Sequence, residues 1–101
     1  MLYLQPSIYD TRKALSGWER LVVERAEQQF VGFPEYNRKV YAAYRRSLPE
    51  RAEKDGYLFV DGDLAIAAEA KGVFADHVHL GSRGNRLVGQ HLAGVLERLG
   101  R

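Results

Sequence analysis

The sequence predicts a single α/β domain over residues 1–101, in which helices dominate, and two observations support this prediction. Two short apolar runs, residues 2–4 and 57–60, have the length and side chains of strands buried in a sheet. Longer segments with helix start and stop signals lie between them and after them. Two parallel strands covered by helices leave unpaired edges, so a longer sheet must form. Either the natural gene continues upstream, or two copies pair across a two-fold axis, and we expect the homodimer if the chain is stable as given.

The composition is that of an ordinary globular protein, with 46% hydrophobic residues, 28% charged residues and no cysteine. The lack of cysteine excludes disulfides and thiolate metal sites. The formal net charge is only +2, and acidic residues are interleaved with basic ones, so we expect no nucleic-acid partner. No apolar stretch is long enough to span a membrane and no signal-peptide pattern opens the chain, which favours a cytoplasmic protein without a membrane partner.

Start and stop signals place two helices between the apolar runs. Ser16 and Glu19 form a capping box that predicts the start of the first helix. Phe33-Pro34 opens the second, because proline is tolerated in a first turn, and Gly56 is a natural stop. Apolar residues recur every four positions along this second helix and predict its buried face. They are Tyr36, Val40, Tyr44 and Leu48.

Three further features complete the expected helices. Pro49 falls inside the apolar stripe, and we expect it to kink or restart the helix, with Ser47 as a new N-cap. An Ala-rich run over residues 64–70 predicts a short helix that Gly72 stops. The last helix follows a Gly-containing turn, with Ser82 as its expected cap. The chain would therefore hold two parallel strands and four to five helices.

The turn before the last helix carries the one arrangement that suggests catalysis. Asp76 and His79 are three residues apart, so the carboxylate can reach Nδ1 of the imidazole. Such a contact fixes the tautomer and leaves Nε2 able to accept a proton. This is the half of a hydrolytic triad that orients the base and takes the proton; a serine would complete it.

Around these residues the chain resembles a known family. Residues 76–80 read Asp-His-Val-His-Leu, residues 84–88 read Gly-Asn-Arg-Leu-Val, and Asn37-Arg38 and the strand ending at Asp61 also fit. These blocks look like the C-terminal half of the SGNH hydrolases, also called GDSL-type esterases and lipases. The resemblance implies a partial flavodoxin-like three-layer unit, with His79 as general base and Asp76 as its orienter. The family's Gly-Asp-Ser nucleophile block and its middle-block oxyanion donors are not present in this sequence.

Two serines are candidates for the missing nucleophile. Ser7 follows the first strand, at the sheet edge where α/β sites gather, but a turn serine after proline is the simpler interpretation. Ser82 lies in Gly-Ser-Arg-Gly, whose glycine spacing is not that of a nucleophile elbow. In the same turn, Arg83 and Gly84 could bind an anion at the helix N-terminus. No metal-ligand or nucleotide-binding spacing accompanies the three histidines or the glycines, so we expect neither a metal nor a cofactor.

Together these observations predict a segment of a serine ester hydrolase that is inactive or incomplete alone. Its substrate would be an acylated carbohydrate or a lipid, as the resemblance implies. The alternative is a non-catalytic homo-oligomerising or binding module that keeps the same scaffold.

Overall fold

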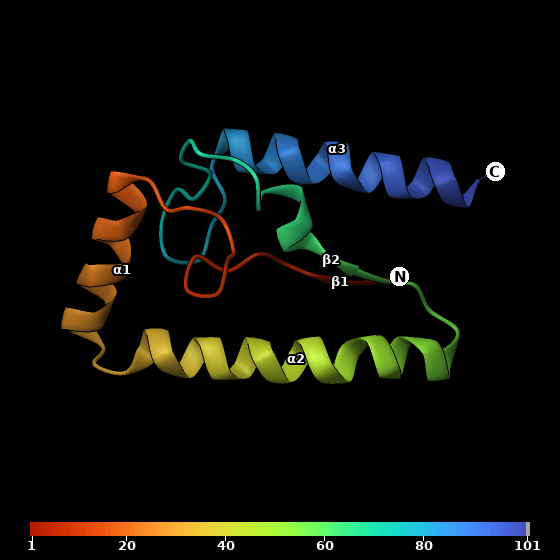
Figure 1. Cartoon of the computed structure of the whole chain (residues 1–101), viewed down its shortest axis with the longest axis horizontal. Coiled ribbons are helices and arrows are strands. Elements are labelled where there is room, and N and C mark those ends of the chain that lie inside the picture. The colour runs from red at the N-terminus through yellow and green to blue at the C-terminus, as the bar shows by residue number, and fades with distance from the viewer. Residues whose placement is uncertain (101) are drawn as a thin grey trace.

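The computed structural model describes residues 1–100 and arranges them in three layers, with a two-stranded sheet between two long helices (Figure 1). The strands β1 (Leu2–Leu4) and β2 (Phe59–Asp61) pair in parallel, with Leu2 opposite Phe59. The helices are α1 (Gly17–Gln29), α2 (Phe33–Asp55) and α3 (Ser82–Leu99), and a short 3₁₀ helix, η1 (Gly62–Ala65), follows β2. In Figure 1, α2 and α3 flank the strands and α1 closes one end. The predicted α/β class and the parallel pairing are confirmed.

Residues 1–100 hold three α-helices and one 3₁₀ helix, against the four to five helices that were expected. The helix expected over 64–70 does not form; η1 ends at Ala65 and turns follow it. Asp61 starts η1 by accepting a hydrogen bond from the Asp63 N–H at 3.1 Å. The chain then turns so that Ile66, which is fully buried, enters the core.

Helix α2 differs from the prediction in two ways. It continues through Pro49 without a restart, and Ser47 donates back to the Ala43 carbonyl at 3.0 Å instead of acting as an N-cap. Its predicted apolar stripe is wrong at Tyr36 and Tyr44, which are 64% and 44% exposed, whereas Val40 and Leu48 are half-buried. The expected stop at Gly56 is confirmed, with φ of 76° at the C-cap.

The face that α2 turns toward the strands is polar. Tyr41 Oη donates to the Gln5 carbonyl at 2.9 Å. Arg45 forms ion pairs with Asp10 and, through Nε at 3.2 Å, with Asp61. This stripe of side chains includes Asn37, which lies one turn before Tyr41. Specific polar contacts therefore hold the longest helix to the sheet.

Helix α3 begins at a very close contact. Gly81 is its N-cap residue without a side-chain cap, so the expected capping by Ser82 was wrong. A Cβ added to Gly84 would lie 2.5 Å from the Val73 carbonyl oxygen, which means that only glycine lets the helix approach the loop this closely. None of the helices in the described residues combines the length and the apolar character that crossing a bilayer requires.

The main core lies at the end of the molecule closed by α1. It joins the segment after β1, the middle of α1 and the loop before α3. Its buried members are Ile8, Tyr9, Ala26, Ile66, Val73 and Phe74. Because Val73 and Phe74 belong to it, the loop that carries Asp76 and His79 starts from a fixed base.

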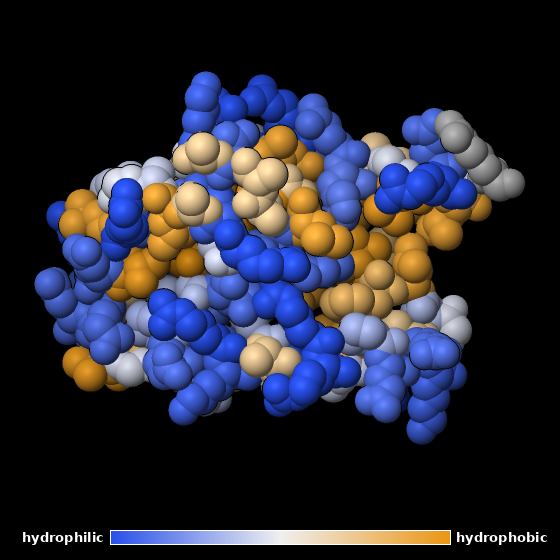
Figure 2. All heavy atoms as spheres, in the orientation of Figure 1, coloured by the Kyte–Doolittle hydropathy of each residue, from blue (hydrophilic) through white to orange (hydrophobic). Residues whose placement is uncertain are grey.

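Both edges of the sheet are open. Leu2 donates its N–H to the Leu58 carbonyl at 2.7 Å, so alternation along β1 turns the main chain of Tyr3 away from β2. No third strand lies beside Tyr3 in residues 1–100. Apolar side chains also gather between the strands and the C-terminal half of α3 (Figure 2).

Candidate active site

A short hairpin-like loop presents the predicted dyad. Phe74 and Leu80 form an isolated antiparallel bridge at its base. The Ala75 N–H donates to the His79 carbonyl at 2.8 Å, and the Gly81 N–H donates to the Val73 carbonyl at 2.7 Å. The turn over residues 75–79 is thus closed by main-chain hydrogen bonds, which fix its backbone before any side chain is considered.

Within this loop the predicted contact between Asp76 and His79 is present. Nδ1 of the imidazole lies 3.0 Å from Asp76 Oδ2 and 3.1 Å from Oδ1. Oδ1 also accepts the main-chain N–H groups of Val78 and His79, each at 2.8 Å. The Val78 N–H, the His79 side chain and the His79 N–H together lower the pKa of Asp76 to about 2. At neutral pH the carboxylate is therefore ionised and holds Nδ1 as the donor.

The opposite side of the imidazole faces solvent. The His79 side chain is 72% exposed, and in the described residues no hydrogen bond forms at Nε2. His79 borders an open hollow of about 280 Å³ beside the free edge of β1. The hollow is lined by Tyr3, Gln5, Leu80, Asn85 and Val88 in addition to His79. A reacting group could therefore approach Nε2 from this side without displacing a protein group.

A buried carboxylate fixes the base of the loop. Glu19 Oε2 accepts the N–H groups of Val73 at 2.9 Å and Phe74 at 3.1 Å. Its other oxygen lies 2.5 Å from Lys13 Nζ and accepts the Ser16 N–H at 2.9 Å. Burial raises the pKa of Glu19, but Lys13 and the three main-chain donors outweigh it and lower the pKa to about 2. Hydrogen bonds through Glu19 therefore connect the first turn of α1 to the loop segment that precedes Asp76.

This role of Glu19 was not found from the sequence. The capping box predicted its contact with Ser16, and that contact is confirmed by the Glu19 N–H donating to Ser16 Oγ at 3.2 Å. The partners at Val73 and Phe74, however, lie 54 and 55 residues further along the chain. The only available signal was a Lys six residues before a capping-box Glu, and a local pattern of this kind does not identify a distant partner.

Ser7 lies apart from the dyad. It is buried, its hydroxyl donates to Asn37 Oδ1 at 2.8 Å, and it accepts the Tyr9 N–H at 3.3 Å. It borders a different hollow from the one beside His79. The structure therefore does not bring Ser7 and Nε2 together.

The predicted anion site at the start of α3 consists of groups that already have neighbours. Arg83 Nη1 lies 3.9 Å from the Glu69 carboxylate, and Gly84 packs against the Val73 carbonyl. Ser82 is exposed, and no hydrogen bond joins it to His79. His91 lies on α3, partly buried, with its Nδ1 atom enclosed and unpaired.

The candidate site thus consists of an ionised aspartate, an oriented imidazole and an open hollow. Glu19 fixes the base of the loop through the N–H groups of Val73 and Phe74. Among residues 1–100, no group of three or more potential ligands is placed to hold a metal ion. Comparison with protein-family models, with curated proteins and with solved structures finds no match for the chain.

Proposed function

We propose that this chain is a segment of an ester hydrolase of the SGNH, or GDSL, type, carrying the Asp–His half of its catalytic triad. The observation that carries the proposal is the contact of Nδ1 with both oxygens of Asp76, which leaves Nε2 of His79 open to the hollow. A carboxylate behind an imidazole is the arrangement that makes histidine a directed base. The sequence resemblance to the C-terminal half of that family supports the same residues.

In this mechanism Asp76 holds the imidazole in one tautomer and stabilises the charge that it gains. Nε2 of His79 takes the proton from a hydroxyl as its oxygen attacks the ester carbonyl. The same proton then passes to the leaving alkoxide. Within residues 1–100 no side-chain hydroxyl is bonded to Nε2, so the attacking hydroxyl comes from another polypeptide segment, or from water when the chain acts alone.

Hydrolysis of p-nitrophenyl acetate by the isolated chain tests the dyad, with water as the attacking group. We expect His79→Ala to lower the rate above the buffer background by about 10²-fold, the lower end of what a positioned general base contributes. His91→Ala, the same change on α3 away from the loop, serves as the control and should leave the rate as it is. Equal rates for the wild type and His79→Ala would contradict the proposal.

A second measurement examines the orienting role of Asp76. We expect ¹⁵N spectra of neutral His79 to show the proton on Nδ1, and Asp76→Asn to shift it to Nε2, because the amide can donate to Nδ1. The hydrolysis rate should fall with it, by no more than the loss of about 10²-fold expected for His79→Ala, because Asp76 acts through the imidazole. A tautomer that Asp76→Asn does not change would remove Asp76 from the mechanism.

The open edge of β1 favours a second candidate function, a homo-oligomerising module that uses the same scaffold without catalysis. A second copy paired antiparallel at Tyr3 would form a four-stranded sheet with helices on both faces. Light scattering should then report twice the protomer mass of 11.5 kDa. Tyr3→Pro removes the outward N–H but no bond to β2, and should return the mass to that of one protomer. Tyr3→Phe keeps the N–H and should stay dimeric, whereas a wild-type monomer would exclude this candidate.

A further inference from the structure

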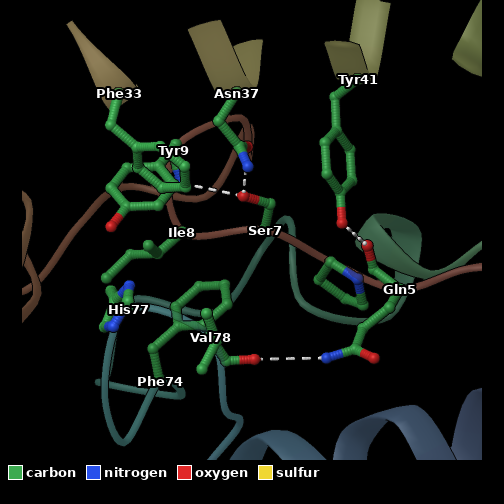
Figure 3. Close-up of a pocket in the computed structure, with 11 residues that line it drawn as sticks. Gln5, Ser7, Ile8, Tyr9, Phe33, Asn37, Tyr41, Phe74, His77 and Val78 are labelled. Carbon is green, nitrogen blue, oxygen red and sulfur yellow. Dashed lines mark hydrogen bonds between the residues drawn. The ribbon is translucent and has the colours of Figure 1, made fainter. Parts of the chain in front are cut away.

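A second hollow lies next to the dyad loop, between α2, the segment after β1 and the turn before α3 (Figure 3). It measures about 220 Å³. In Figure 3, Phe33, Asn37 and Tyr41 reach down from α2, while Phe74 and Val78 face them from the loop. Ile8 and Phe74, both almost fully buried, make its apolar base. The mechanism proposed above does not use this hollow.

The lining determines the charge of what can bind. No Lys, Arg, Asp or Glu borders it. An anion or a cation would have to leave water without an opposite charge to receive it, which is costly. The hollow therefore suits a neutral ligand.

Polar groups around the hollow are not all paired within the protein. Ser7 uses Asn37 Oδ1 as its acceptor, and in residues 1–100 the amide nitrogen of Asn37 has no partner. Gln5 Nε2 reaches the Val78 carbonyl at 3.4 Å, while its amide oxygen is unpaired. Tyr41 Oη donates its proton to the Gln5 carbonyl and keeps its lone pairs. A ligand with both hydroxyl donors and acceptors would satisfy these groups.

The size and the aromatic walls narrow the ligand further. Pockets for drug-sized molecules start at about 300 Å³, so this hollow holds a single ring or a short group rather than a long acyl chain. Phe33 and Tyr41 add aromatic area to the lining, which also contains the amides of Asn37 and Gln5. One apolar face with hydroxyls around its rim is the character of a sugar ring.

From this lining we infer that the hollow binds one neutral, hydroxylated ring, a single monosaccharide unit, and so selects an acylated carbohydrate over a lipid as the ester. This choice of ester rests on the proposed hydrolase function, whereas binding of the ring does not. Gln5 borders both this hollow and the one that contains His79. Because Gln5 is shared by the two linings, an acyl group on the bound ring would extend past Gln5 toward the imidazole.

Amide NMR spectra of the ¹⁵N-labelled chain test the inference, with methyl glucoside as the probe. We expect saturable shifts at the side-chain amides of Asn37 and Gln5, with millimolar affinity. Asn37→Asp keeps the oxygen that Ser7 needs but loses both amide donors, and should weaken binding at least about tenfold. Gln90→Glu makes the matching change on the exposed surface of α3 and should bind as the wild type does.

Two further probes test whether the hollow prefers a neutral ligand, and one variant tests whether binding is independent of the dyad. Inorganic phosphate and hexanoate should not shift the Asn37 amide, and stronger binding of either would overturn the inference. Absence of saturable shifts with methyl glucoside would overturn it as well. His79→Ala should bind the glucoside normally, so a loss of ester hydrolysis with intact binding separates a failure of the dyad from a failure of the hollow.

Discussion

The two ends of the sheet are built differently. At the end closed by α1, the loop around Asp76 and His79 rests on a buried carboxylate whose hydrogen bonds are all made. At the other end, Leu64 and Leu99 are 59% and 60% exposed beside an open hollow of about 320 Å³. The candidate site thus lies where directional bonds determine the geometry, whereas the opposite end of the sheet keeps an open hollow.

The lengths of the elements explain this contrast. Helices α2 and α3 have 23 and 18 residues, hence lengths of about 34 and 27 Å, whereas three-residue strands extend only about 10 Å. Both helices therefore extend beyond the sheet that they cover. The molecule is also thin, 17 Å along its shortest axis, because two strands give little width. Leu96 and Leu99, near the C-terminal end of α3, consequently stay exposed.

The largest expected effect comes from breaking the anchored end. Glu19→Ala would leave Lys13 buried without its counter-charge and two main-chain N–H groups unbonded, at a cost of about 3–5 kcal/mol in the free energy of unfolding. Urea denaturation measures this. Leu99→Ala, at the other end, should change stability by no more than about 0.5 kcal/mol.

Similar losses of unfolding free energy in Glu19→Ala and Leu99→Ala would mean that the two ends of the sheet contribute equally to stability. Should Glu19→Ala fail to fold, Glu19→Gln keeps an acceptor for the Val73 and Phe74 N–H groups and gives a milder version of the same test.

A smaller effect is expected where α3 touches the anchored loop. Gly84→Ala forces a methyl group against the Val73 carbonyl and should destabilise the protein by about 1–3 kcal/mol. Gly89→Ala lies on the same helix with open space around it, and should stabilise by up to about 1 kcal/mol through helix propensity. Thermal unfolding of the pair gives opposite signs if the contact at Gly84 is as close as described, and equal signs if it is not.

The smallest change in the free energy of unfolding is expected on acidification. The pKa of Glu19 lies near 2 in the folded protein and near 4.5 when unfolded, so its stabilisation is complete above pH 4.5 and is lost as the pH falls toward 2. The slope should be at most about 1.4 kcal/mol for each pH unit in that window. Glu19→Gln should flatten the curve of unfolding free energy against pH between these values. An unchanged slope in that variant would assign the acid sensitivity to other carboxylates.

Local signals in the sequence predicted much of this structure. The capping box at Ser16, the stop at Gly56 and the contact of Asp76 with His79 each depend on residues within four positions of one another. The parallel pairing of the two apolar runs followed from general rules for α/β proteins. Such features need no knowledge of the rest of the fold.

The errors arose where distant partners decide the outcome. Tyr36 and Tyr44 fit an apolar stripe in the sequence but are exposed. Helix α2 instead turns Arg45 toward the sheet, because its guanidinium forms ion pairs with Asp10 and Asp61. Pro49 stays inside a continuous helix that is long enough to tolerate one missing hydrogen bond. Ion pairs between residues 16 and 35 positions apart leave no periodic pattern in a sequence.

The hydrogen bonds that Glu19 accepts from Val73 and Phe74 affect the dynamics of the backbone. The sheet has only two strands of three residues, so its few inter-strand hydrogen bonds can open together and their amides should exchange hydrogen for deuterium quickly. The amides of Val73 and Phe74, bound to a carboxylate in the protein interior, should exchange slowly although they belong to a loop. The slowest-exchanging part of this domain outside its helices would then be the segment that leads to its candidate base, ahead of the sheet itself.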